Sequence, residues 1–188
     1  VNPLGGAKTS LPMQVVAGMD GRLVILDRQW RIQRFAPDGA VVDQKSRPWL
    51  MHAPVAVTVD DAGMLFVSGG GTLAAYDPAT GLVWQAQVGG GTGHAVALGI
   101  GPAPRHDVVA LDALNDALEL FDRATGRVVS ARPLPPSAGE RALWGDLDLD
   151  AAGNAYALDR VNGTVAVLPL GAAGGAVRTV ALPPRTRR

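Results

Sequence analysis

Four similar segments recur along the chain, and this repetition constrains the fold more than any other feature. The steps between them are 42, 43 and 47 residues, counted at Asp27, Gly69, Asp112 and Asp159. Each segment reads as a short strand, and each is followed by a second strand-like run and a turn. The segments are GRLVILD (21–27), GMLFVSG (63–69), DVVALD (107–112) and GNAYALD (153–159). Several short strands per unit, at a period of about 40–50 residues, are typical of β-propeller blades.

The composition agrees with an all-β chain. Of the 188 residues, 47% are hydrophobic but only 5% are aromatic, and the chain holds 24 Gly and 14 Pro. Short runs of Val, Leu and Ala between tight turns are typical of strands. We therefore predict an all-β β-propeller of four four-stranded blades, whose strands we name A to D in chain order. The predicted parts are an N-terminal extension or linker (1–12), a propeller region (13–183) with blades at about 13–44, 53–87, 95–132 and 144–182, and a basic tail (184–188).

The sequence leaves open whether the four blades are an arc of a larger propeller or close into a four-bladed ring. Every predicted blade owns all four of its strands, and residues 1–12 do not read as a strand that closes a ring. The chain also begins at Val1, so we expect a processed product or part of a longer polypeptide. An arc is favoured, and it needs further blades, from the same chain or from a partner, to cover its end faces.

Charge and residue types exclude several classes of function. Seventeen basic and seventeen acidic residues give a formal charge of zero, so no field of one sign attracts nucleic acid or an anionic membrane. The chain has no cysteine, which excludes disulfides, thiolate catalysis and cysteine zinc sites. No apolar run approaches the roughly 18 residues needed to cross a bilayer. We expect no cofactor, no nucleic acid and no direct membrane insertion.

Two of the repeats carry a family resemblance. The stretches DGRLVILDRQWRIQRFAPDG (20–39) and DAAGNAYALDRVNGTVAVL (150–168) resemble NHL repeats. The stretches AAYDPATGLVWQ (74–85) and LFDRATGRVV (120–129) are similar to quinoprotein-type and other propeller repeats. The resemblance covers nearly the whole chain and implies the fold. It leaves function open, because NHL-like blades occur in scaffolds, in RNA- and protein-binding modules, and in lyases and hydrolases.

Chain direction divides the loops of a propeller between two rims. The A–B and C–D turns share one rim, and the B–C and D–A loops share the other, which we call the long-loop rim because its loops are longer and more charged. Loops on a rigid scaffold usually carry the binding residues. The predicted binding residues on the long-loop rim are Arg28, Trp30, Arg31, Trp49, His52, His94, Asn115, Arg141 and Arg160.

Three groups on or near this rim each allow two interpretations. His52 and His94 both lie just before strand A, in consecutive blades. They are either metal ligands, or a general base with its partner, or loop histidines bonded to the backbone. Trp30 and Trp49 are either anchors of a protein or glycan interface, or side chains packed between blades. The GDLDLDAAGN stretch (145–154) is either a calcium loop or a strand with one acidic face. The second interpretation is favoured in each case.

The aspartate at the end of strand B recurs as Asp27, Asp112 and Asp159. Recurrence at equivalent positions favours a structural turn or cap over a catalytic acid.

The function predicted from these observations is a non-catalytic interaction or structural module within a larger protein or assembly, such as a phage-tail-like or envelope complex. Its partner is a protein or the remaining blades of a larger propeller. The alternative is an NHL-like lyase or hydrolase, with a channel-mouth metal held by His52 and His94.

Overall fold

The structure is a computed structural model that describes residues 12–18, 20–29, 31–46, 53–102, 107–137, 139–171 and 175–183. In these residues sixteen strands form four antiparallel sheets of four consecutive strands each, which confirms the predicted four-bladed all-β propeller. The strands are β1 (Pro12–Ala17), β2 (Leu23–Asp27), β3 (Arg31–Phe35) and β4 (Val41–Ser46) in blade 1; β5 (Pro54–Val59), β6 (Leu65–Gly69), β7 (Thr72–Asp77) and β8 (Gly81–Gln87) in blade 2; β9 (Ala95–Ile100), β10 (Val108–Asp112), β11 (Ala117–Phe121) and β12 (Val128–Pro133) in blade 3; and β13 (Trp144–Leu149), β14 (Asn154–Asp159), β15 (Thr164–Pro169) and β16 (Arg178–Ala181) in blade 4.

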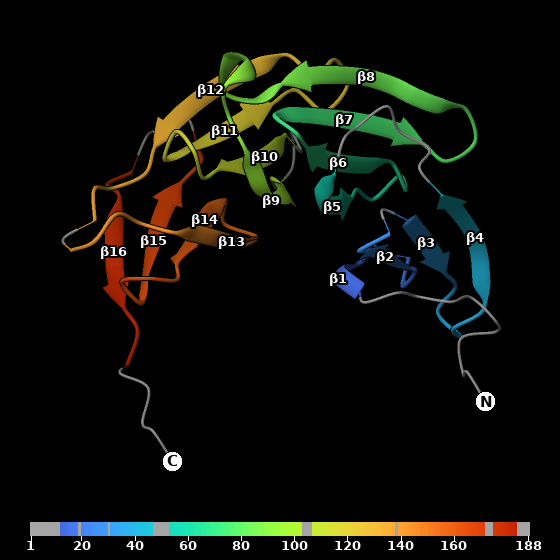
Figure 1. Cartoon of the computed structure of the whole chain (residues 1–188), viewed down its shortest axis with the longest axis horizontal. Helices are drawn as coiled ribbons and strands as arrows, with labels where there is room; N and C mark the ends of the chain where they lie inside the picture. Colours follow the sequence, from blue (N-terminus) through green and yellow to red (C-terminus); the bar gives the residue numbers. More distant parts are fainter. Residues whose placement is uncertain are drawn as a thin grey trace.

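The four blades follow one another around an open arc, with blade 1 and blade 4 at its two ends (Figure 1). The innermost strands β1, β5, β9 and β13 pack side by side in this order around the centre, and β4, β8, β12 and β16 form the outer edges. The described part of the chain contains one short 3-10 turn, η1 (Val88–Gly91), and no helix with the length and apolar character of a membrane span.

The A–B turns of blades 2 and 4 have the same hydrogen bonds. In blade 2, Asp60 N donates to Met64 O (3.1 Å) and Gly63 N donates to Asp60 O (3.1 Å). In blade 4, Asp150 N donates to Asn154 O (3.0 Å) and Gly153 N donates to Asp150 O (3.0 Å). Gly63 and Gly153 have φ values of 83° and 82°, in the left-handed region that favours glycine. The turns can therefore be compared residue by residue.

Three apolar cores lie between neighbouring blades. The core between blades 1 and 2 includes Leu26 and Val57, the core between blades 2 and 3 includes Phe66 and Phe121, and the third, between blades 3 and 4, is the largest of them. Its buried members are Ala97, Val109, Leu111, Leu118, Leu120, Leu134, Trp144, Leu147, Ala155, Ala157, Ala166 and Leu168. Each blade in the arc thus stabilises its neighbours by face-to-face packing.

Burial of the second strand distinguishes interior blades from end blades. All five residues of β6 and all five of β10 are buried. In β2, Val24 and Leu26 are buried toward blade 2, while Leu23 on the opposite face is 39% exposed. In β14 the alternate residues are buried toward blade 3, and Tyr156 and Leu158 on the opposite face are only half-buried. The outer faces of blades 1 and 4 are therefore uncovered by any blade of the arc.

Candidate functional site

Buried aspartates at the end of strand B close the loops of the long-loop rim. Asp112 is fully buried, and its Oδ1 accepts the N–H groups of His94 (2.8 Å) and Leu114 (3.1 Å), while its Oδ2 accepts Asn115 Nδ2 (2.7 Å). One carboxylate thereby fixes both the B–C turn and the start of strand A in the same blade. Asn115 and His94, predicted as binding residues, are brought together by this cap.

Asp159 repeats this arrangement in blade 4. It accepts the N–H groups of Leu143 (3.1 Å) and Val161 (3.1 Å) and the side chain of Asn162 (2.6 Å). Burial raises the pKa of Asp159, but these hydrogen bonds outweigh burial, and the pKa lies below the usual value for aspartate. Asp27 caps blade 1, where Oδ1 accepts Gln29 N (2.9 Å) and Oδ2 accepts Arg31 Nε (2.8 Å). These contacts support the structural interpretation of the recurring aspartate.

Blade 2 lacks this aspartate and has Gly69 at the same position. A Cβ on Gly69 would lie 2.7 Å from Ala53 O, so the backbone of the incoming loop occupies the space of a side chain. Gly70 and Gly71, with φ values of 56° and 78°, continue the turn. The chain therefore closes this loop by direct backbone approach, which only glycine permits.

The other predicted rim residues have different surroundings. Arg31 is bound to Asp27 within its own blade, and Arg160 Nη2 donates to Gly145 O (2.6 Å). Arg28, His94 and Arg141 are exposed on the rim. Trp30, Trp49 and His52 lie outside the described residues, so the interface anchors and the His52–His94 metal pair stay predictions. No group of three metal-binding side chains occurs among the described residues.

Two of the predicted binding residues, Asn115 and Arg141, line the same pocket on the long-loop rim. This rim pocket has a volume of about 440 Å³ and lies between the B–C turn of blade 3 and the loop that leads into blade 4. Its floor includes Trp144, whose Nε1 donates to Asp116 Oδ1 (2.9 Å). Prolines and Leu134 supply apolar walls, and Ser137, Glu140 and Arg141 supply polar groups. A concave site that mixes apolar walls with a few polar groups is the usual form of a binding pocket.

A second pocket, of about 390 Å³, lies where the innermost strands of all four blades meet. Its polar side chains include Gln14, Thr58, Asp146 and Asp148. Asp146 and Asp148 are exposed and alternate with Leu147 and Leu149 along β13, as the acidic-strand interpretation predicts. This pocket is wide and polar, and its carboxylates accept only the adjacent main-chain N–H groups of their own strand in the contacts described.

Asp150, which follows β13, belongs to the A–B turn. Its Oδ1 accepts Asn154 N (2.8 Å), and its Oδ2 accepts both Asn154 Nδ2 (2.8 Å) and Tyr156 Oη (2.8 Å). The hydrogen bonds from the Asn154 side chain and backbone, followed by that from Tyr156, lower the pKa of Asp150 to about 2. Asp150 is thus satisfied within its own blade.

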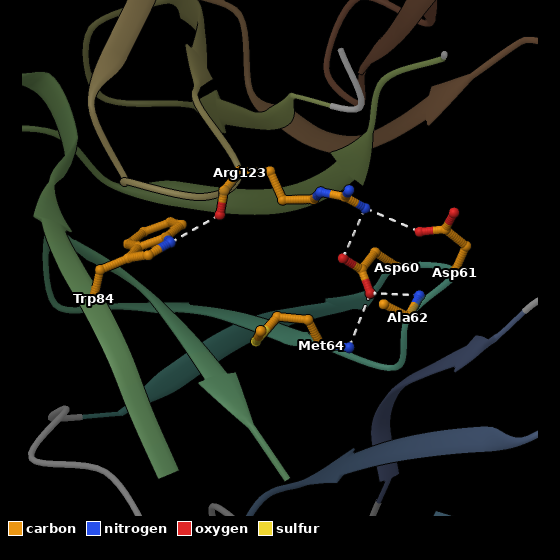
Figure 2. Close-up of polar contacts among 6 residues, drawn as sticks. All are labelled: Asp60, Asp61, Ala62, Met64, Trp84 and Arg123. Carbon is orange, nitrogen blue, oxygen red and sulfur yellow. Dashed lines mark hydrogen bonds and ion pairs between the residues drawn. The ribbon is translucent and has the colours of Figure 1, made fainter. Parts of the chain in front are cut away.

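An interblade clasp on the opposite rim was not predicted from the sequence. Figure 2 shows Arg123, in the C–D turn of blade 3, reaching the A–B turn of blade 2. Its Nη1 donates to Asp60 Oδ2 (2.9 Å) and to Asp61 Oδ1 (2.9 Å), while Trp84 Nε1 of blade 2 donates to Arg123 O (2.8 Å). Trp84 is half-buried and lies over Gly126, where a Cβ would be only 2.5 Å from the indole. Each of the two blades therefore donates a side-chain hydrogen bond to the other.

Comparisons with known proteins give the fold and no family. No family model matches the chain, and no curated protein matches it. Among solved structures, a catalytically inactive virginiamycin B lyase from Staphylococcus aureus with quinupristin has a TM-score of 0.70 and 12% identity, over 96% of this chain and 58% of that one. BamB from Moraxella catarrhalis has a TM-score of 0.61 and 18% identity, over 88% and 48%. The Swd1 β-propeller domain from Myceliophteria thermophila has a TM-score of 0.63 and 12% identity, over 87% and 53%.

These matches show that the chain has a β-propeller architecture. The chain spans less than two thirds of the length of each of these three proteins. Membership of the NHL repeat family stays a prediction, because identities this low carry the fold alone.

Proposed function

We propose that this chain is a β-propeller interaction module that works within a larger protein or assembly. Its long-loop rim binds a partner, and the outer faces of blades 1 and 4 receive further blades or another protein. No reaction is assigned to the module.

The observation that carries the proposal is the uncovered outer face at each end of the arc. Leu23 and Val15 on blade 1 are 39% and 59% exposed, and Tyr156 and Leu158 on the outer face of blade 4 are half-buried. The residues of β6 and β10 at the positions of Leu23, Tyr156 and Leu158 are all buried between blades, and so are Val57 and Leu98 at the position of Val15. Apolar groups arranged to pack against a neighbour, but left in water, are typical of an interaction surface.

The rim pocket supports the proposal that the long-loop rim binds a partner. It joins residues from two blades, so its shape is held by the packing of Trp144 between them rather than by one loop. Arg141 and Glu140 are exposed at its edge and are available to a partner. A polar edge around an apolar floor is the common form of a protein interface.

The lyase or hydrolase alternative has no specific support among the described residues. The likeness to a lyase is at 12% identity, and one of the two proposed metal ligands, His52, lies outside the described residues.

The proposal is tested by measuring apolar surface on the isolated, folded chain with a fluorescent dye that binds such surface, together with circular dichroism. We expect dye binding to the native chain and a clear reduction in the variant Leu23→Lys, which places a charge on the outer face of blade 1. Leu114→Lys is the matched control, because Leu114 is 54% exposed in a turn of the long-loop rim. A folded chain that binds no dye, or equal binding by both variants, would contradict the proposal.

A further inference from the structure

The interface between blades 2 and 3 contains a polar pair whose counterparts differ at the other interfaces. Asp60 is the first residue of the A–B turn in blade 2, and Arg123 follows the last residue of β11 by two positions in blade 3. The main-chain hydrogen bonds of the turns place Gly18, Gly101 and Asp150 at the position of Asp60 in the other blades.

The partner position varies together with this turn residue. Strand pairing places Pro78 of blade 2 and Leu170 of blade 4 at the position of Arg123. At the interface of blades 1 and 2, Gly18 is therefore matched by Pro78. At the interface of blades 3 and 4, Gly101 is matched by Leu170. Only Asp60 precedes an arginine. Asp150, on the last blade, repeats the acidic residue but has no following blade in the arc.

A second polar pair crosses the same interface on the long-loop rim. Gly89 N, in the loop after β8, donates to Glu119 Oε2 of blade 3 (2.9 Å). After β12 the position of Gly89 is taken by Pro135, which has no N–H, and the position of Glu119 in the next blade is taken by Ala166. Blade 3 thus has the acceptor Glu119 where blade 2 supplies the N–H of Gly89, and blade 4 has no acceptor at this position where blade 3 has Pro135.

Blade 1 carries an acceptor at this position. Gln33 pairs with Ile25 in β2 as Glu119 pairs with Ala110 in β10. The Gln33 side chain is fully buried, its Nε2 donates to Gln44 Oε1 (2.8 Å), and its Oε1 has no hydrogen-bond partner. A buried acceptor without a donor costs about 1–3 kcal/mol, so its retention calls for an explanation.

The two ends of the arc do not complement each other. If a second copy placed its blade 1 against blade 4, Asp150 would meet Pro37, which stands at the position of Arg123. In the same contact Gln33 would meet Pro183, which follows Leu182 as Gly89 follows Val88. Gln33 Oε1 would then face a proline in place of a donor. Asp150, whose carboxylate already accepts Asn154 and Tyr156, would meet a proline and not a cation to balance its charge.

We propose that the ends of this arc are covered by propeller blades of different sequence and not by a second copy of the chain. The blade that packs on blade 4 presents an arginine from its C–D turn to Asp150, and the blade that packs on blade 1 donates a main-chain N–H to Gln33. This inference rests on the proposed role of the end faces and adds the chemistry of their partner.

The test places on the chain itself the two groups that join blades 2 and 3, an arginine and a main-chain N–H. The variant P37R/P183G places an arginine opposite Asp150 and an N–H opposite Gln33 when two copies meet head to tail. Its association is measured by sedimentation equilibrium beside that of the unaltered chain, with D150N added in one further variant and D148N in another. Asp148 is the matched control because it is an exposed carboxylate of the same blade that takes no part in the clasp position.

We expect P37R/P183G to associate about tenfold or more tightly than the unaltered chain, since one ionic contact of about 1.4 kcal/mol corresponds to this factor. D150N should remove the gain, and D148N should keep it. The proposal is overturned if the unaltered chain associates as tightly as P37R/P183G, if the gain survives D150N, or if P37R/P183G keeps the circular dichroism and Tm of the unaltered chain and yet shows no gain. Each of these results leaves the dye-binding test of the proposed function unaffected.

Discussion

The two interior blades and the two end blades share one plan of strands and differ in what covers them. In β6 and β10 both faces of the strand are buried, whereas in β2 and β14 the face turned away from the arc is half in water. The end strands keep apolar residues on those faces, including Leu23 and Leu158. The difference teaches that a blade buries both faces of its second strand only when it has a neighbour on each side.

The largest test of this comparison is a pair of aromatic truncations at equivalent positions. Phe66 in β6 is fully buried against Trp84 and blade 3, and Phe66→Ala should lower the free energy of unfolding by about 3–5 kcal/mol. Tyr156→Ala at the same position of β14 should cost less than about 2 kcal/mol, because Tyr156 is only half-buried. Urea unfolding measures both. Equal costs would mean that the outer face of blade 4 is as well covered as an interior face.

Loss of an aspartate cap should cost the same in an interior blade and in an end blade, since each cap acts within one blade. Asp112→Ala in interior blade 3 and Asp159→Ala in end blade 4 each leave several partly buried N–H groups without this acceptor. Both should lower the unfolding free energy by about 2–3 kcal/mol. Asp112→Asn, which keeps one acceptor oxygen, should cost less than Asp112→Ala in the same urea experiment. If only Asp112→Ala lowered the unfolding free energy, the contribution of the cap would depend on the packing between blades.

The clasp between blades 2 and 3 should contribute a smaller amount. Arg123→Ala removes the cation from Asp60, whose side chain is 3% exposed, and we expect a loss of about 1–2 kcal/mol in thermal unfolding. Arg127→Ala, at an exposed position near the same turn, is the control and should stay within about 0.5 kcal/mol of the unaltered chain. A loss from Arg127→Ala as large as that from Arg123→Ala would assign the effect to the turn and not to the clasp.

The smallest effect concerns pH at the end blade. The folded pKa of Asp150 is about 2, below the unperturbed value of 3.8, so the folded state favours the ionised form. Its contribution to stability is fully present above pH 3.8 and is lost as the pH falls toward 2. Asn154→Ala removes the main hydrogen bond and should move the pKa back toward 3.8 in an NMR titration of the Asp150 carboxyl group. An unchanged pKa would mean that Asn154 does not hold the ionised form.

Much of the fold could be predicted from the sequence, because its signals are local. Alternating apolar residues and glycine turns define each strand, and the recurrence of Asp27, Asp112 and Asp159 identified the caps. The clasp could not be predicted in this way. Asp60 and Arg123 are 63 residues apart, and their contact depends on the stagger between two sheets, which a strand pattern does not contain.

The candidate site was predicted in part for the same reason. Chain direction alone placed Asn115 and Arg141 on the long-loop rim, but their meeting in one pocket depends on how blade 4 packs against blade 3 around Trp144. Arg31 and Arg160 belong to the same predicted set, but Arg31 pairs with Asp27 and Arg160 donates to Gly145 O, each within its own blade.

The prolines at the two ends of the arc have a consequence for solubility. A protein whose opposite ends fit each other, without a rotation that closes the series, grows into a filament. The repeated plan of this chain gives it two ends of similar shape, so it is exposed to that hazard. Under the proposal made above, Pro37 and Pro183 deny each head-to-tail contact the arginine and the main-chain N–H that join blades 2 and 3, and growth by simple addition of copies is disfavoured at the first step.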